Sequence, residues 1–156
     1  MFKIAVLVSG GGTDLQSIID AVENKEIDCK IEMVISSKEG VYSLERAKKH
    51  GIESHVITKK EYKDKQSDKI LSLVDGKVDL IVLAGYLSIL DGEILEKFKN
   101  RIINIHPSLI PSFCGPNMYG LKVHEAAIKK GVRFSGCTVH FVNNEVDGGA
   151  IILQEA

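Results

Sequence analysis

The feature that most constrains this fold is the alternation of short apolar, β-branched segments with segments of helical periodicity. Four segments have the length and composition of strands: KIAVLV (3–8), KIEMVIS (30–36), ESHVIT (53–58) and DLIVLAG (79–85). Two of the intervening segments, DLQSIIDAVEN (14–24) and VYSLERAKKHG (41–51), have helical periodicity, and Gly51 closes the second. This βαβ alternation favours a parallel sheet whose faces are covered by helices.

The C-terminal third predicts an antiparallel edge. A fifth apolar run, RIINI (101–105), is followed by FSGCTVHFV (134–142) and GAIILQ (149–154), which flank the turn signal NNEVDGG. We therefore expect one α/β domain over residues 1–156, with a Rossmann-like, mostly parallel twisted sheet, helices on both faces and an antiparallel C-terminal edge. The charged stretch 59–69 is interpreted as a solvated helix face.

Composition and charge narrow the class of function. The 156 residues are 44% hydrophobic and 26% charged, which is enough for one compact domain. A net charge of −1 gives no general attraction to nucleic acid or anionic membranes, and the apolar start MFKIAVLV is too short to span a bilayer. The three cysteines form no C-x-x-C pair. We expect a cytoplasmic protein with small-molecule partners, no nucleic acid, no membrane and no metal.

A glycine loop, SGGGTD (9–14), connects the first predicted strand to the first predicted helix. Free N–H groups and the helix dipole suit a phosphate there, and Thr13-x-x-Gln16 has the form of a capping box. The dinucleotide fingerprint would need glycine in place of Leu15, and the Lys-Ser/Thr pair of a Walker loop is missing. The loop therefore predicts a phosphate site without a nicotinamide cofactor, or, as the alternative, a purely structural turn.

The sequence NIHPS (104–108) places an amide and an imidazole two residues apart at a strand end. Residues i and i+2 of a strand face the same way, so Asn104 and His106 are expected to project together into a crevice. The amide can donate to an oxyanion, and the imidazole can carry a proton. Pro107 then turns the chain toward SFCGPNMYG (112–120), a loop that can lie over the site. The alternative is an ordinary strand end with a structural histidine.

Asp147, in the turn before the last predicted strand, is the candidate acid. If the hairpin folds back over the sheet, its carboxylate reaches His106 and favours the imidazolium form. The alternative is an aspartate required only by the turn. The other histidines are interpreted as structural (His50, His55 and His124) or left undecided (His140).

Six segments of the chain occur together in a fixed order: VSGGGTDLQSIIDA, LERAKKHGI, VLAGYLSIL, NIHPSLIPSFCG, KVHEAAI and GCTVHFVNNEVDGGAIILQ. Taken together, they resemble the phosphoribosylglycinamide formyltransferases of the folate-dependent formyltransferase superfamily. The resemblance spans essentially the whole chain. NIHPSLIPS and VDGG are typical of the superfamily, and SGGGTDLQ is typical of the branch that uses a ribonucleotide.

The resemblance implies a function and a set of site residues. The implied reaction transfers formyl from the cosubstrate N10-formyltetrahydrofolate to the amine of glycinamide ribonucleotide in purine biosynthesis, through a tetrahedral intermediate, in a monomer or homodimer. Alternatives are a formyltetrahydrofolate hydrolase or a non-catalytic folate- or nucleotide-binding module. The implied residues are catalytic Asn104, His106 and Asp147, phosphate-binding Gly12, Thr13 and Asp14, and folate-binding Lys65, Leu87, Ser88, Ile89, Leu90 and Asn104.

The chain departs from the family pattern at several positions. Asp14 stands where the family commonly has asparagine, which places a carboxylate beside the phosphate. Lys65 stands in place of an arginine, so the charge is kept and the planar fork is lost. The loop after Cys114 is longer than usual. Family members continue past Ala156 into a C-terminal helix, and we expect this domain to lack that helix and to expose apolar surface on its sheet.

Overall fold

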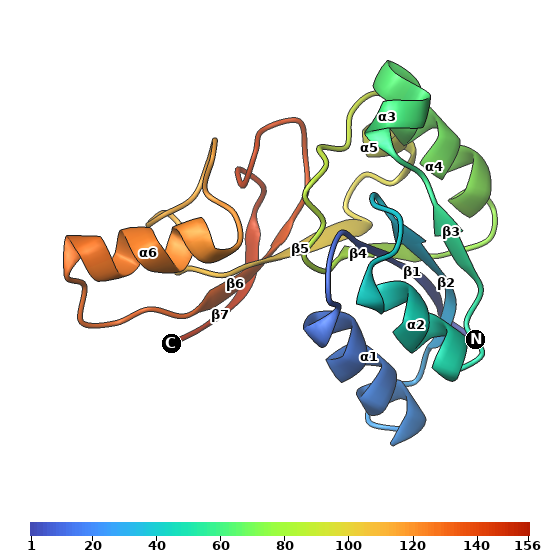
Figure 1. The fold of residues 1–156 in the computed structure, drawn as a ribbon, viewed down its shortest axis with the longest axis horizontal. Coiled ribbons are helices and arrows are strands. Elements are labelled where there is room, and N and C mark those ends of the chain that lie inside the picture. The colour runs from blue at the N-terminus through green and yellow to red at the C-terminus, as the bar shows by residue number, and fades with distance from the viewer.

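The computed structural model describes residues 1–156 and contains one seven-stranded sheet with the order β3-β2-β1-β4-β5-β6-β7 (Figure 1). Strands β1 to β5 pair in parallel, whereas β6 pairs antiparallel with both β5 and β7. The mostly parallel sheet with an antiparallel C-terminal edge is therefore confirmed. The strands are β1 (Lys3–Val8), β2 (Lys30–Ser36), β3 (Ser54–Val56), β4 (Leu80–Leu83), β5 (Ile102–His106), β6 (Cys137–Phe141) and β7 (Ile151–Glu155).

The helices connect the strands and follow the predicted periodicity. The segments expected to be helical at 14–24 and 41–51 form α1 (Thr13–Glu23) and α2 (Tyr42–Lys49). The charged stretch 59–69 forms α3 (Lys59–Tyr62), a 3-10 turn η1 (Lys63–Lys65) and the start of α4 (Gln66–Val74). The remaining helices are α5 (Glu93–Lys97) and α6 (Leu121–Lys130). No helix combines the length and the apolar composition that crossing a membrane requires.

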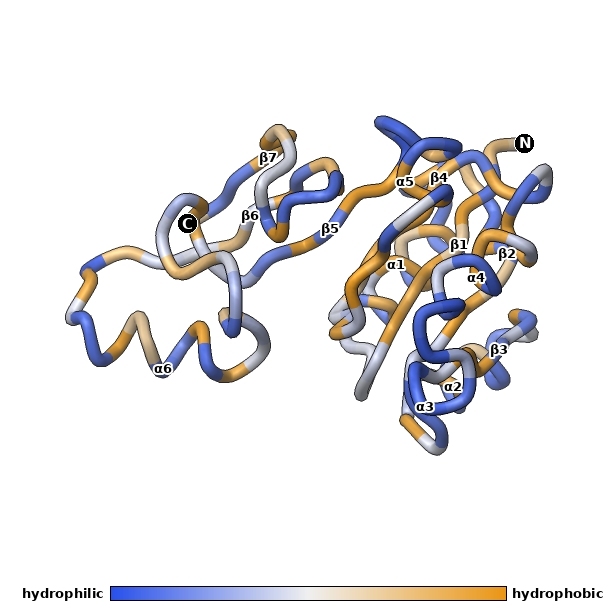
Figure 2. The backbone as a smooth tube through the Cα atoms, turned by 90° about the horizontal axis from the view of Figure 1, so that it is seen from above, coloured by the Kyte–Doolittle hydropathy of each residue, from blue (hydrophilic) through white to orange (hydrophobic).

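Two apolar clusters hold the sheet between its helices. Because side chains alternate along a strand, Leu7 of β1 packs into a cluster of 16 residues with α4 and α5, while Val6 packs into a cluster of 11 residues with α1 and α2. Both side chains are fully buried, which typically stabilises a fold by about 1.5–3 kcal/mol per side chain. Figure 2 shows the run of hydrophobic residues through β1 and β4. This rigid core fixes the positions of the loops at the strand ends.

The start of α1 differs from the predicted capping box. The N-cap is Gly12, in the left-handed region with φ 79°, and no side chain caps the helix. Thr13 is already the first helical residue, so its hydroxyl cannot act as the N-cap. The Gln16 side chain instead donates to Asp20 and accepts from Arg46. The capping-box prediction was wrong because the glycine, rather than the threonine, makes the turn into the helix.

Candidate active site

A cavity of about 450 Å³ opens at the carboxyl ends of β4 and β5. Ligands of open α/β sheets commonly bind at this edge. Four segments line the cavity: the loop 85–90 after β4, the end of β5 at 104–107, the loop 115–120 and the hairpin 142–147 between β6 and β7. The three predicted catalytic residues, Asn104, His106 and Asp147, all line it.

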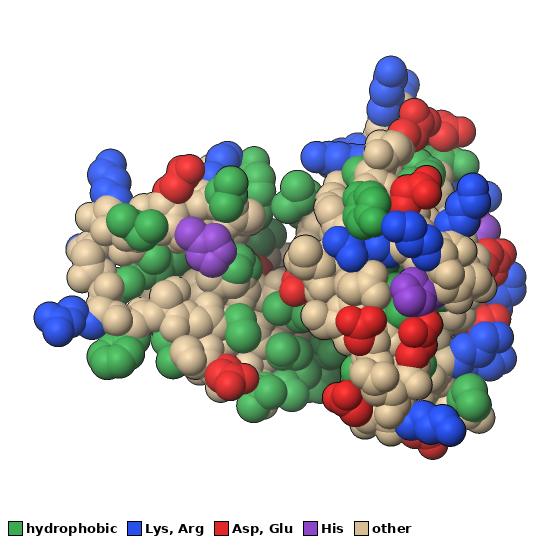
Figure 3. All heavy atoms as spheres, turned by 60° about the horizontal axis from the view of Figure 1, so that its bottom comes forward, with side chains coloured by type: hydrophobic (Ala, Val, Ile, Leu, Met, Phe, Trp, Pro, Cys, Tyr) green, Lys and Arg blue, Asp and Glu red, His purple; other side chains and the backbone are tan.

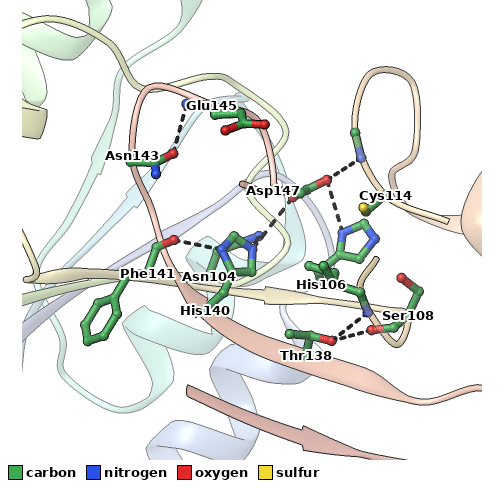
Figure 4. Close-up of polar contacts among 12 residues, drawn as sticks. Asn104, His106, Ser108, Cys114, Thr138, His140, Phe141, Asn143, Glu145 and Asp147 are labelled. Carbon is green, nitrogen blue, oxygen red and sulfur yellow. Dashed lines mark hydrogen bonds and ion pairs between the residues drawn. The ribbon is translucent and has the colours of Figure 1, made fainter. Parts of the chain in front are cut away.

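Asp147 lies between two histidines (Figure 4). Its Oδ2 is 3.6 Å from His106 Nδ1 and its Oδ1 is 3.7 Å from His140 Nε2. The Gly115 N–H donates to Oδ2 at 2.9 Å, which orients the carboxylate. Asp147 has φ 55°, a left-handed conformation that aspartate adopts more readily than most residues. The hairpin thus brings the predicted acid within ion-pair distance of the predicted base.

The His106 ring is buried and held from both sides. Its Nε2 is 2.8 Å from the Phe113 carbonyl, and since a carbonyl only accepts, Nε2 carries the proton. Nδ1 is therefore the ring nitrogen that faces Asp147. The Phe113 carbonyl thus anchors the ring at Nε2 and leaves Nδ1 directed toward the Asp147 carboxylate.

His140 positions the amide of Asn104. The antiparallel register of β5 and β6 pairs these two residues directly, and Asn104 Nδ2 lies 3.2 Å from His140 Nε2. His140 Nδ1 donates to the Phe141 carbonyl at 2.8 Å, so in the neutral ring Nε2 accepts from the amide. One N–H of the Asn104 amide is thereby fixed and the other stays available. His140 is a site residue that sequence spacing left undecided, and only the strand register identifies its role.

Buried hydroxyl groups hold the chain that follows His106. Thr138 Oγ1 donates to the Ser108 carbonyl at 2.7 Å and accepts from the Ile110 N–H at 3.1 Å. Ser108 Oγ donates to the Ser112 carbonyl at 2.6 Å. Thr138 and Ser108 are both fully buried. These contacts fix the path of the loop whose Phe113 carbonyl binds His106, and sequence reasoning did not single them out.

The predicted folate-binding segment 87–90 lines the same cavity. Leu87, Ser88, Ile89 and Leu90 all contribute to the lining. The Leu87 N–H donates to Ser9 Oγ at 2.8 Å, which ties this loop to the end of β1. The Asp91 N–H donates to the buried Ser67 Oγ at 3.0 Å. Ser67 lies in the charged stretch 59–69, which was interpreted as a solvated helix face. Most charged residues of that stretch are exposed, but the interpretation did not anticipate a buried serine that supports the loop after β4.

The predicted phosphate-binding residues and the predicted folate-binding Lys65 lie outside this cavity. Gly12, Thr13 and Asp14 follow β1, and the side chains of Thr13 and Asp14 are exposed. The Lys65 side chain is 73% exposed and pairs with Asp68 at 3.7 Å. The structure therefore does not bring Lys65 to the cavity, and its contact with folate stays a prediction. Other basic side chains, Lys59 and Lys63, line an adjoining cavity of about 320 Å³ that shares Ile89 with the first.

Burial raises the pKa of two side chains that lie at or near the cavity, Tyr86 and Cys114. Desolvation raises the pKa of the Tyr86 hydroxyl to about 12, so this residue is neutral at physiological pH. Burial, followed by the nearby charge of Asp147, raises the pKa of the Cys114 thiol. A thiol with a raised pKa is a poor nucleophile. No group of three or more His, Cys, Asp or Glu side chains is arranged to hold a metal ion.

Comparison with known proteins identifies relatives over the whole chain. The formyl transferase family matches residues 2–156. The phosphoribosylglycinamide formyltransferase of Haemophilus influenzae is 48% identical over 160 residues, covering 99% of this chain and 72% of the relative. The human trifunctional purine biosynthetic protein adenosine-3 is 43% identical over 157 residues, covering 99% of this chain, which spans only 15% of that relative's length.

A solved structure supports the same relationship. Glycinamide ribonucleotide transformylase 1 from Symbiobacterium toebii superimposes with a TM-score of 0.92 at 40% identity, covering 99% of this chain and 72% of that one. The family match over the sequence and the superposition of the fold agree with each other. The chain therefore belongs to the formyl transferase family.

Proposed function

We propose that this chain transfers the formyl group of N10-formyltetrahydrofolate to the amine of glycinamide ribonucleotide. The observation that carries the proposal is the convergence of Asn104, His106 and Asp147 in one cavity, which the loop 87–90 also lines. An amide donor, an imidazole and a carboxylate at this spacing are suited to acyl transfer through an oxyanion. Relatives with this reaction in their names match the chain nearly end to end.

Binding of the two substrates uses backbone atoms at neighbouring strand ends. The pterin of the folate packs between the loop 87–90 and the hairpin 142–147, where it can exchange hydrogen bonds with main-chain groups. The phosphate of the ribonucleotide binds to N–H groups of Gly12, Thr13 and Asp14 at the start of α1. The bond from the Leu87 N–H to Ser9 Oγ fixes these two binding loops relative to each other.

Transfer then proceeds by direct attack. The substrate amine adds to the formyl carbon, and the carbonyl oxygen becomes an oxyanion that accepts hydrogen bonds from the free Asn104 N–H and from His106 Nδ1–H. Asp147 stabilises the positive charge on the His106 ring. The attacking nitrogen loses a proton, N10 of the folate gains one, and the C–N10 bond breaks. The products are formylated ribonucleotide and tetrahydrofolate.

The main rival reaction is hydrolysis of the same folate, in which water replaces the amine. The same three side chains could serve that reaction, since function resides in the site rather than in the fold. The glycine loop favours the ribonucleotide as acceptor, because a hydrolase has no use for a second anion site. Measuring tetrahydrofolate release with and without glycinamide ribonucleotide separates the two. Release that does not depend on the ribonucleotide would support the hydrolase, and binding without release would support a non-catalytic module.

Two variants test the catalytic assignment. We expect His106→Ala and Asn104→Ala each to lower kcat by about a hundredfold, the usual loss for a proton carrier or an oxyanion donor. His124→Ala is the matched control, because His124 is exposed on α6 and lies outside the cavity. Turnover near the wild-type rate in a folded His106→Ala protein would rule out this mechanism.

A further inference from the structure

Two side chains of α2, Ser43 and Arg46, donate hydrogen bonds to carbonyls of the glycine loop. We call this pair of side chains the brace. Ser43 Oγ donates to the Gly10 carbonyl at 2.5 Å, and the Ser43 N–H approaches the same oxygen at 3.3 Å. Arg46 Nε donates to the Gly11 carbonyl at 2.8 Å. These contacts join parts of the chain that are more than 30 residues apart. The mechanism described above uses neither side chain.

The brace determines where the loop directs its N–H groups. In a trans peptide the carbonyl and the N–H of the next residue point in opposite directions. Because the carbonyls of Gly10 and Gly11 are bound on the α2 side, the N–H groups of Gly11 and Gly12 are directed away from α2. No hydrogen bond in the structure uses either of these N–H groups. Two adjacent free donors on one side of a loop form a concave site for an anion.

The arginine in this brace is itself firmly held. Its guanidinium lies 4.6 Å from the centre of the Tyr42 ring, and Nη1 donates to Gln16 Oε1 at 3.1 Å. Gln16 belongs to α1, so Arg46 bonds both to the loop and to the helix that follows it. Gly12 leaves the room that this packing needs, because a Cβ at that position would collide with the Ser43 side chain.

We propose that Ser43 and Arg46 are positioning residues for the substrate phosphate. They fix the carbonyls of Gly10 and Gly11, so that the N–H groups of Gly11 and Gly12, together with the first turn of α1, are preorganised for the anion. This inference rests on the proposed function, since it assigns the phosphate of the ribonucleotide to this loop. It predicts that loss of the brace weakens ribonucleotide binding and leaves the chemical step and folate binding unchanged.

The test compares dissociation constants for glycinamide ribonucleotide, inorganic phosphate and folate. We expect Ser43→Ala and Arg46→Ala each to raise the ribonucleotide Kd and KM about tenfold, as for loss of a hydrogen bond that orients groups around a charge, with kcat at saturation within about twofold. The folate Kd should not change. Lys48→Ala is the control, because it removes a positive charge from the same helix at an exposed residue whose side chain contacts neither the loop nor Tyr42.

Arg46→Lys separates positioning from charge. Lysine keeps the positive charge and loses the planar fork that bonds Gly11 and Gln16 together, so we expect it to bind the ribonucleotide nearly as weakly as Arg46→Ala does. Wild-type affinity in Arg46→Lys, or an equal loss of folate and ribonucleotide affinity in Arg46→Ala, would overturn the inference. If wild-type protein binds phosphate but does not use the ribonucleotide, the proposed function fails, and the phosphate Kd of the same variants decides the inference.

Discussion

The N-terminal part of the molecule is built on β1 to β4, and the C-terminal part is built on β5 to β7. Different interactions stabilise these two parts. Every member of the two apolar clusters except Ile102 comes from residues 4–98. After Ile102 the buried residues are the apolar Val123 and Ala127 and the polar His106, Ser108, Thr138 and His140. In Figure 1 the second part extends away from the helix-covered sheet.

The surfaces of the two parts also differ, because the C-terminal part exposes more apolar side chains on its strand and helix. All five residues of β7 are exposed, and α6 exposes Leu121 and Ile128. On the face in Figure 3, charged side chains crowd the N-terminal part, while hydrophobic side chains gather toward the C-terminal part. The N-terminal part carries the glycine loop and the loop 87–90, which we proposed as binding loops, next to its apolar core. In the C-terminal part, the polar groups that stabilise the structure include the groups assigned to catalysis, and such networks depend on every partner being satisfied.

Matched leucine substitutions test this contrast and give the largest expected effect. Leu7→Ala empties a fully buried site in β1 and should lower the free energy of unfolding by about 2–5 kcal/mol. Leu153→Ala makes the same change in β7, where the side chain is 62% exposed, and should cost less than about 0.5 kcal/mol. Urea unfolding measures both. Similar losses in the two variants would show that the parts do not differ in how they are held.

Thr138→Val tests whether buried hydrogen bonds stabilise the C-terminal part. Valine has nearly the same shape as threonine but leaves the Ser108 carbonyl and the Ile110 N–H without their partner. We expect a loss of about 1–3 kcal/mol in the free energy of unfolding, because buried polar groups would be left unsatisfied. Turnover should fall as well, since this contact supports the loop that binds His106. A valine variant with unchanged stability and turnover would mean that the hydroxyl network contributes little.

Sequence reasoning was most successful in the part with the apolar core. The strands β1, β2 and β4 and the helices α1 and α2 follow directly from apolar periodicity, and β6 and β7 were found from the turn between them. The i, i+2 spacing predicted that Asn104 and His106 would project together, and a hairpin folded back over the sheet was expected to bring Asp147 to His106. All three residues line one cavity.

What the sequence could not supply depends on tertiary packing. The role of His140 follows from its register opposite Asn104, which no local pattern encodes. Ser43 and Arg46 reach the glycine loop only because α2 packs beside α1. The same packing places Gln16 against Arg46, and the N-cap is Gly12 rather than Thr13, so the capping box that the spacing suggested does not form.

Two tyrosines that line the cavity, Tyr86 and Tyr119, should titrate differently. Burial raises the pKa of Tyr86 in the N-terminal part to about 12, whereas the hydrogen bond from Lys122 lowers the pKa of the exposed Tyr119 in the C-terminal part. The folded state therefore holds the Tyr86 proton more tightly than the unfolded state does. The stability that depends on this proton is complete below pH 10 and is lost as the pH rises toward 12.

Phenylalanine variants measure these contributions. Between pH 10 and pH 11 the wild-type protein should lose about 1 kcal/mol more unfolding free energy than Tyr86→Phe. In an absorbance titration, Tyr86→Phe should lack the latest phenolate step, and Tyr119→Phe should lack an early one. Identical titration curves for the two variants would contradict the difference in environment.

The smallest expected effect concerns Asp14, in the loop whose backbone N–H groups we propose to bind the substrate phosphate. The carboxylate is exposed on the first turn of α1, so it and the substrate phosphate are attracted by the same helix end. Asp14→Asn should tighten ribonucleotide binding about threefold at low salt, and the gain should shrink as salt screens the repulsion.

Asp28→Asn removes the same charge beyond the far end of α1 and should have no such effect. The measurement is the ribonucleotide Kd of both variants across a salt series, with the folate Kd as reference. Weaker ribonucleotide binding by Asp14→Asn at every salt concentration would mean that the carboxylate itself contacts the substrate, and the phosphate would then have to bind elsewhere than on these N–H groups.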